Sequence, residues 1–180
     1  QTNSHHNGNL FCALDALERW LTLQLDCGVD ITPYVERILH EGTSTALIGL
    51  LVNVGKYRPS LFSGVLAPVL TDPNVFYWDS GRVNNIRYRF DTFSWVRAGE
   101  EVFNIARDWT LAPHRQKALL DIVVALLTTD GTVAAHLQAQ IPNWPLPEDP
   151  KEALEFKLFF AQLNRDNYRH ITDSETGDEV

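Results

Sequence analysis

Apolar residues recur at helical spacing from Leu10 to Leu25. The stripe they form consists of Leu14, Leu17, Leu21 and Leu25, with Phe11 and Trp20 beside it. Asp15, Glu18 and Arg19 are predicted to fall largely on other, solvated faces. This pattern predicts an amphipathic helix that ends near Gly28.

Further helices follow from the same spacing and from start and stop signals. Thr32 before Pro33, Thr43 or Ser44, Asp130, and Asp149 before Pro150 are each predicted to begin a helix. The predicted ranges are 32–42, 44–58, 60–69, 72–77, 100–109, 113–127, 130–141 and 150–164. A proline at 68 is expected to kink or shorten the fourth helix.

The segment 80–99 has a different pattern. Ile86, Tyr88 and Phe90 alternate with polar residues, which is strand periodicity. No second alternating run offers a partner strand, so we predict an irregular or short-helical segment.

Helices of this length joined by short loops pack antiparallel to their neighbours. An echo at an offset of 33 residues relates Leu14, Leu17 and Leu21 to Leu47, Leu50 and Val54. We therefore predict an all-α fold of antiparallel helix hairpins stacked as a short, HEAT-like α-solenoid. A closed helical bundle is the alternative. The expected core includes Leu14, Leu17, Leu21, Leu47, Leu50, Leu51, Leu119, Val123, Leu126, Leu158 and Phe159.

The predicted organisation is one helical repeat domain over 11–170, between a flexible segment 1–10 and a flexible acidic tail 171–180.

The net charge of -8 argues against a nucleic-acid backbone as the main partner. No apolar run approaches the ~20 residues of a membrane span. Cys12 and Cys27 lie too far apart on a helix for a disulfide, so we expect reduced thiols in a cytoplasmic protein.

Motifs for phosphate, metal or covalent chemistry are not found, and we predict no cofactor, no metal site and no catalysis. The least improbable catalytic pair is His114 as acid or base with Asp108 as its orienter. The alternative is a corner between helices, in which Trp109 fills the junction. The His5–His6 pair sits in a polar terminus and is not expected to bind metal.

The stretch from Tyr77 to Arg97 interleaves large aromatic residues with arginines. Its candidate contact residues are Tyr77, Trp78, Arg82, Arg87, Tyr88, Arg89, Trp95 and Arg97. These residue types are enriched at interface hot spots. They could instead stack on single-stranded nucleic acid, or pack between helix pairs. If 86–91 is extended, Arg87 and Arg89 share one side and form a positive spot for an acidic partner.

Four runs resemble the helical repeat region of very large bacterial signal-transduction-type ATP-binding proteins. These runs are 13–21, 54–62, 76–79 and 106–115. In that family the nucleotide site lies in a separate P-loop domain, so the resemblance implies no catalytic residue here. It implies a helical arm that senses a partner or holds the NTPase inactive, in proteins that often serve in defence against phage.

The predicted function is therefore a non-catalytic interaction or regulatory scaffold module, part of a larger bacterial NTPase. Its partner would be another protein or another domain of the same chain. The alternatives are a small helical enzyme built around His114 and Asp108, and a single-stranded nucleic-acid binder that uses 77–97.

Overall fold

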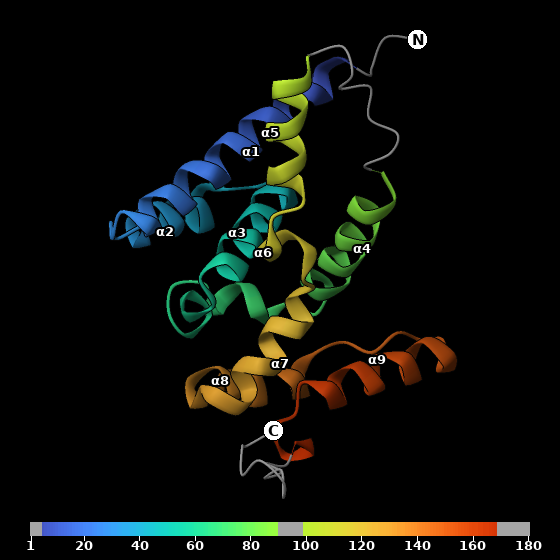
Figure 1. Cartoon of the computed structure of the whole chain (residues 1–180). Coiled ribbons are helices and arrows are strands. Elements are labelled where there is room, and N and C mark those ends of the chain that lie inside the picture. The colour runs from blue at the N-terminus through green and yellow to red at the C-terminus, as the bar shows by residue number, and fades with distance from the viewer. Residues whose placement is uncertain (1–4, 90–98, 169–180) are drawn as a thin grey trace, which may run out of the picture. The chain divides into compact units, whose positions relative to one another are not determined.

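The computed structural model describes residues 5–89 and 99–168, with side chains for 12–85 and 99–168 (Figure 1). All regular structure within these residues is helical, which confirms the all-α prediction. The α-helices are α1 (His5–Asp26), α2 (Thr32–Glu41), α3 (Thr45–Tyr57), α4 (Asn74–Arg89), α5 (Glu100–Thr110), α6 (Pro113–Gln116), α7 (Leu119–Thr129), α8 (Gly131–Gln140) and α9 (Pro150–Gln162). The 3₁₀ helices are η1 (Pro59–Ser63), η2 (Ala67–Thr71), η5 (Ile141–Asn143) and η6 (Arg165–Asn167).

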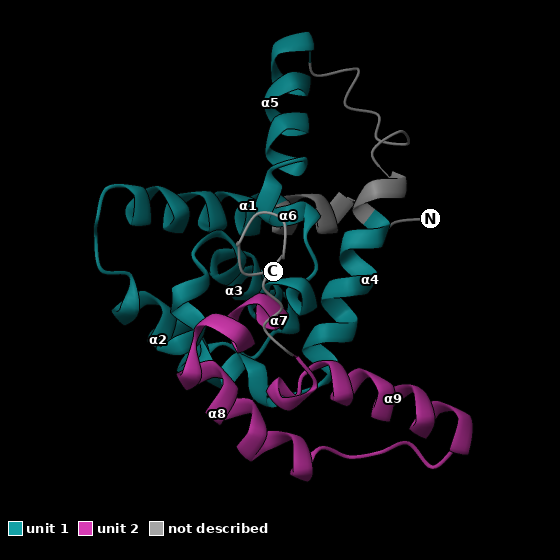
Figure 2. Cartoon of the chain, turned by 60° about the horizontal axis from the view of Figure 1, so that its bottom comes forward, with its two compact units in different colours: residues 1–122 teal, residues 123–180 magenta. Residues whose placement is uncertain are grey.

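The chain divides into two compact units, Gln1–Ile122 and Val123–Val180 (Figure 2). The larger unit holds α1 to α6 and the first turn of α7. The smaller unit holds the rest of α7 with α8 and α9. The single repeat domain proposed for 11–170 stays a prediction.

The core of the larger unit forms around α3, which packs against α1. Every residue of α3 from Leu50 to Lys56 is buried. Phe62 of η1 is fully buried and its ring lies directly over Gly55. A Cβ at Gly55 would stand only 2.3 Å from the Cζ atom of that ring, so this close approach requires glycine.

The predicted core residues divide into three groups. Leu21, Leu50, Leu51, Leu119, Val123 and Phe159 are buried, as expected. Leu14, Leu17, Leu47 and Leu126 are half-buried. Leu158 is 60% exposed, so its prediction was wrong. The buried face of α9 includes the next residue instead, because the side chain of Phe159 packs against Trp144.

Three predicted helix starts are confirmed by their hydrogen bonds. Ser44 accepts from the backbone N–H of Ala46, and the side chains of Asp130 and Asp149 accept from two backbone N–H groups each. The prediction for Thr32 was wrong. Thr32 already lies in the helix, and its backbone N–H donates to the carboxylate of Asp30.

Several boundaries differ from the prediction. The range 60–69 forms two 3₁₀ helices, each with a proline in its first turn. The short helix 72–77 instead continues as α4 to Arg89, so the strand-like alternation at 86–89 was misleading. Residues 90–98 lie outside the described part. α1 begins at His5, inside the segment predicted to be a flexible terminus, and the tail 171–180 also lies outside the described residues.

In the smaller unit, aromatic side chains join α9 to the segment after η5. The Trp144 ring stacks on Phe159 and meets Phe160 edge to face, with ring centroids 6.4 Å and 5.0 Å apart.

Among the described helices, none is by itself both long and apolar enough to cross a membrane. One pair, α7 with the run 131–143, meets that test of length and composition together, across a bend of 115°.

Candidate functional site: a buried charge cluster behind an exposed helix face

Glu18 lies on the buried side of α1, not on a solvated face as predicted, and is only 2% exposed. Its carboxylate accepts from Arg115 through both oxygens, at 2.8 Å and 2.7 Å. Asn53 of α3 donates to it at 2.8 Å, and the Nε2 atom of His114 lies 3.3 Å away. Arg115 also pairs with Asp15, one turn earlier on α1. These contacts tie α6 to α1 and α3.

A second set of contacts is centred on Asp79 of α4. One carboxylate oxygen accepts from Lys56 at 2.8 Å and from Arg82 at 2.7 Å. The other accepts from the backbone N–H of Leu119, the first residue of α7, at 2.6 Å. Lys56 also donates to the backbone carbonyl of Lys117, at 3.0 Å. One carboxylate therefore connects α3, α4 and the start of α7.

These contacts explain why 113–127 is two helices and not the single one predicted. The carbonyl of Lys117 and the N–H of Leu119 are bound by side chains from other helices. The backbone can leave helical geometry between α6 and α7 because its free polar groups are satisfied there.

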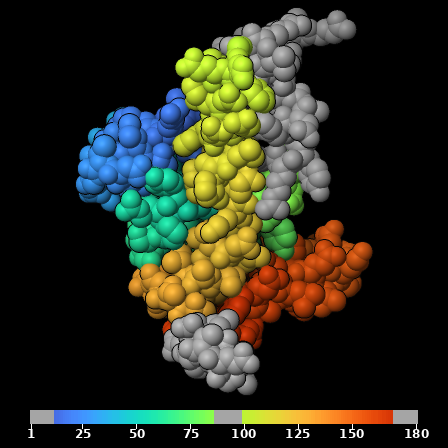
Figure 3. Space-filling view, viewed as in Figure 1, coloured from blue at the N-terminus to red at the C-terminus, as the bar shows by residue number. Residues whose placement is uncertain are grey.

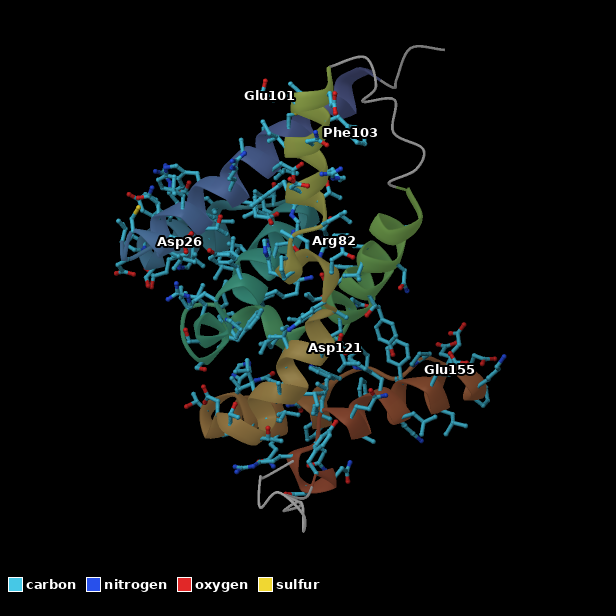
Figure 4. The ribbon with its side chains drawn as sticks, viewed as in Figure 1. Asp26, Arg82, Glu101, Phe103, Asp121 and Glu155 are labelled. Carbon is cyan, nitrogen blue, oxygen red and sulfur yellow. The ribbon has the colours of Figure 1, made fainter. Side chains whose placement is uncertain are left out.

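We call the six ionic residues together the charge cluster. Its members are Asp15, Glu18, Lys56, Asp79, Arg82 and Arg115. Three are acidic and three are basic, so their formal charges cancel. Only Asp15 and Arg82 have substantial solvent exposure. Arg82 lies on the side of α4 that faces α6 (Figure 4). Buried ions are tolerated when they are paired and hydrogen-bonded in this way.

The environment shifts the pKa of two of these groups. Burial by itself raises the pKa of Glu18, but hydrogen bonds from His114 and Arg115, with the Arg115 charge, lower it to about 2. Burial, reinforced by the positive charge of Arg82, lowers the pKa of Lys56 to about 8. Asp79 opposes this second shift but does not cancel it. At neutral pH both side chains are therefore ionised.

Trp109 of α5 covers one side of the cluster. Its ring lies 4.8 Å from the guanidinium carbon of Arg115 and 5.9 Å from that of Arg19. His114 meets the rings of Trp109 and Tyr57 edge to face. The segment around His114 is thus a helix corner filled by Trp109, the structural alternative considered from the sequence.

The two residues of the alternative enzyme hypothesis do not contact each other. His114 is buried against Glu18, whereas Asp108 is exposed and accepts from its neighbour Arg107 at 3.0 Å. The Glu18 carboxylate that His114 contacts also accepts hydrogen bonds from Asn53 and Arg115. The hydrogen bonds of Asn53 and Arg115 to Glu18 join α3 and α6 to α1, an arrangement suited to holding helices together.

The opposite side of α4 faces solvent, and we call it the outer face of α4. It consists of Asn74, Tyr77, Trp78, Gly81, Asn84 and Asn85, all of which are exposed. Trp78 is 52% exposed and Tyr77 is 39% exposed. Among the side chains of α4 that the structure describes, this face carries no charged residue, and Asp79 and Arg82 are paired with each other on the other side.

The other predicted contact residues do not lie on this face as described. Arg82 is not a free cation, since it is bound to Asp79. Arg87, Tyr88 and Arg89 belong to α4, but their side chains are not described. Their backbone is helical, so the shared direction expected from an extended segment does not apply. Trp95 and Arg97 lie outside the described residues.

An open groove of about 570 Å³ lies in the smaller unit, between α8, η5 and α9. Its walls are largely neutral, with Phe160 and Ile141 beside Gln138 and Asn164. In the described part of the chain, no three His, Cys, Asp or Glu side chains are grouped as metal ligands would be. Cys12 and Cys27 are both exposed and unbridged.

Comparison of the chain with protein-family models, with curated proteins and with solved structures finds no match. The geometry described above is therefore the basis for a functional proposal.

Sequence reasoning missed the charge cluster because its members are far apart in the chain. A signal does exist in the local patterns. Glu18 interrupts the stripe between Leu17 and Leu21, and Lys56 follows the apolar run of α3. A charged residue on the apolar side of a helix needs a buried partner. That signal identifies candidates without identifying which residues pair.

Proposed function

We propose that this chain is a non-catalytic protein-interaction module, and that the outer face of α4 is its contact surface. The observation that carries the proposal is the exposure of Trp78 and Tyr77 on a helix whose other side is held by a buried ion pair. Tryptophan and tyrosine are the aromatic residues most enriched among interface hot spots.

The composition of the face supports this function. Tyrosine and tryptophan provide large contact areas with few rotatable bonds, while asparagine and glycine around them provide adaptable hydrogen bonding and close approach. Charged residues, which are depleted at interface centres, are missing from this set of described side chains. The face thus fits a protein partner better than a phosphate backbone.

The anchoring of α4 supports it as well. Asp79 fixes the helix to α3 and to the start of α7 by accepting hydrogen bonds from Lys56 and from the backbone N–H of Leu119. A surface held rigid before binding loses less conformational entropy when the partner arrives. In our proposal the charge cluster holds α4 in place, so that its outer face is rigid before a partner binds.

The wider context is also a proposal. The resemblance to bacterial signal-transduction-type ATP-binding proteins would make these helices a HEAT-like arm, stacked as hairpins, that regulates a P-loop domain of the same protein. Trp78→Ala, made in a protein that joins these helices to such a P-loop domain, would then change the rate of ATP hydrolysis. Where the protein serves in phage defence, it would also change the plating efficiency of phage.

The direct test places a photoreactive amino acid at Asn85, beside Trp78 on the outer face of α4, in the full chain and in cells that express it. Adducts should form with one protein surface, and the purified partner should bind the wild-type chain with a measurable Kd. Trp78→Ala should weaken that Kd at least about tenfold, with helicity unchanged. Leu154→Ala, at an exposed apolar residue of α9, is the control and should leave the Kd unaltered.

Two outcomes would contradict the proposal. Salt-sensitive binding of single-stranded DNA or RNA that depends on Trp78 would assign the face to nucleic acid. Turnover of a substrate that His114→Ala abolishes, with the fold intact, would show an enzyme.

A further inference from the structure

α1 has two apolar sides. One side packs against α3 and includes the buried Leu21. The opposite side is exposed, and we call it the outer stripe of α1. It consists of Ala13, Ala16, Trp20, Leu23 and Cys27, all exposed. A helix that is apolar on both sides is expected to be covered on both sides.

The stripe is large for an isolated surface. Trp20 is 38% exposed and Leu23 is 55% exposed. Tyr34 of α2 extends the patch, because its ring meets Trp20 edge to face with centroids 5.0 Å apart. Val29 in the turn between the helices is exposed too. Contiguous exposed apolar surface of this kind marks association sites. α1 and α2, in blue, lie on one flank of the larger unit (Figure 3).

The spacing of the stripe indicates what covers it. Its residues follow one another at intervals of three, four, three and four positions, the seam pattern of two paired helices. From Ala13 to Cys27 the seam is ~21 Å long, nearly four turns. A helix with the same seam fits it, and a second copy of α1 is such a helix.

The charges beside the seam decide the orientation. Arg19 and Asp26 lie seven residues apart on the same side of the stripe. In an antiparallel pair, Trp20 of one copy sits opposite Leu23 of the other. Arg19 then comes within about two residues, ~3 Å of helix rise, of the other copy's Asp26. The two-fold axis repeats this ion pair. In a parallel pair Arg19 would face Gln24, which is uncharged.

Contacts within the chain hold both charges at this edge. Arg19 lies over the Trp109 ring, and Asp26 accepts from the Tyr57 hydroxyl at 2.7 Å. Asp26 projects at the C-terminal end of α1 (Figure 4).

We propose that the chain forms an antiparallel, two-fold dimer through the outer stripe of α1, with Arg19 of each copy paired to Asp26 of the other. The stripe is smaller than a standard interface, so a dissociation constant in the micromolar range is expected.

Sedimentation velocity of the whole chain tests the dimer. A monomer–dimer equilibrium should appear between about 1 and 100 µM. Leu23→Glu should weaken it at least about tenfold, because it places a charge in the apolar seam. Trp78→Ala, on a different helix, should not change it. A wild-type chain that stays monomeric at about 100 µM overturns the proposal.

Charge exchange tests the orientation. Arg19→Asp and Asp26→Arg should each weaken self-association, since each leaves like charges facing across the seam. Mixed together, the two variants should form a heterodimer at least about tenfold tighter than either homodimer. No gain on mixing would exclude the antiparallel arrangement. Circular dichroism of each variant verifies the fold, because Asp26→Arg also removes the Tyr57 hydrogen bond.

A disulfide provides an independent measurement. The antiparallel seam places residue 16 of one copy opposite Cys27 of the other. Cys12→Ser with Ala16→Cys should therefore cross-link under mild oxidation, and mass spectrometry should identify the 16–27 linkage. A cross-link between the two Cys27 residues instead would show a parallel pair and overturn the proposed orientation.

Discussion

The carboxylate of Asp79, on α4, accepts a hydrogen bond of 2.6 Å from the backbone N–H of Leu119, forty residues later in the chain. The same side chain neutralises Lys56 in the protein interior. The start of α7 is thus capped by a residue from another helix, and its negative charge suits the positive end of the helix dipole.

Replacing Asp79 with alanine should be strongly destabilising. The change leaves Lys56 buried without its counter-ion and Leu119 without its acceptor. We expect the free energy of unfolding to fall by about 3–5 kcal/mol, measured by urea denaturation. Asp108→Ala is the control, because its exposed pair with Arg107 is worth at most about 1 kcal/mol. Equal losses in the two variants would show that the buried pair has no special role.

Glu18 should make stability depend on acid pH. Its pKa in the folded protein, about 2, lies below the ordinary value of 4.5. The ionised group therefore stabilises the fold above pH 4.5, and this stabilisation is lost as the pH falls from 4.5 towards 2. Linkage gives a total of about 3 kcal/mol.

The difference between wild type and Glu18→Gln, measured by denaturation from pH 7 to 2.5, should shrink over that interval. Glu41→Gln is the matched control, since Glu41 forms only an exposed pair with Arg37. A difference that stays constant with pH would contradict the assignment.

Lys56 should make the stability of the fold depend on pH in the alkaline range. Its pKa in the folded protein, about 8, lies below the ordinary 10.5, so the unfolded chain binds more protons between these values. The contribution of this group to stability therefore rises with pH from about 8 to 10.5. The ¹³Cε resonance of Lys56, identified by its loss in Lys56→Met, should titrate near pH 8. Titration near 10.5 would contradict this prediction, because the ion pair with Asp79 would then offset the effect of burial in full.

The two glycines of α3 should respond oppositely to alanine. Gly55→Ala brings a Cβ against the buried Phe62 ring and should cost about 1–3 kcal/mol despite the better helix propensity of alanine. Gly49 has no atom within 4 Å of such a Cβ, so Gly49→Ala should stabilise by about 0.5–1 kcal/mol. Thermal denaturation of both variants gives the comparison. Destabilisation by Gly49→Ala would mean that this site is more crowded than the structure shows.

Local signals were enough to place most helices. The caps at Ser44, Asp130 and Asp149 are set by hydrogen bonds within three residues, so a short window of sequence contains them. The continuation of α4 to Arg89 was missed because alternation at 86–90 imitates a strand, whereas the burial of Phe76 and Asp79 on one face is tertiary information. Local pattern and tertiary packing disagreed there, and packing decided the structure.

The charge cluster could not be assembled from the sequence for a different reason. Glu18 and Arg115 are 97 residues apart, and nothing in either local segment specifies the other. The pattern could indicate that Glu18 needs a buried partner, but several arginines were available. The outer face of α4 was partly anticipated through Tyr77 and Trp78, while its neutrality depends on Arg82 being paired with Asp79.

The cancellation of formal charge within the cluster also constrains how this sequence can diverge. Any single change of sign among its buried members leaves an uncompensated ion in the core, which is too costly for a marginally stable domain. Acceptable routes are paired replacements, such as Lys56 and Asp79 both becoming apolar. In an alignment of relatives, positions 18 and 115, and positions 56 and 79, should therefore covary, and chains that lack one partner should lack the other.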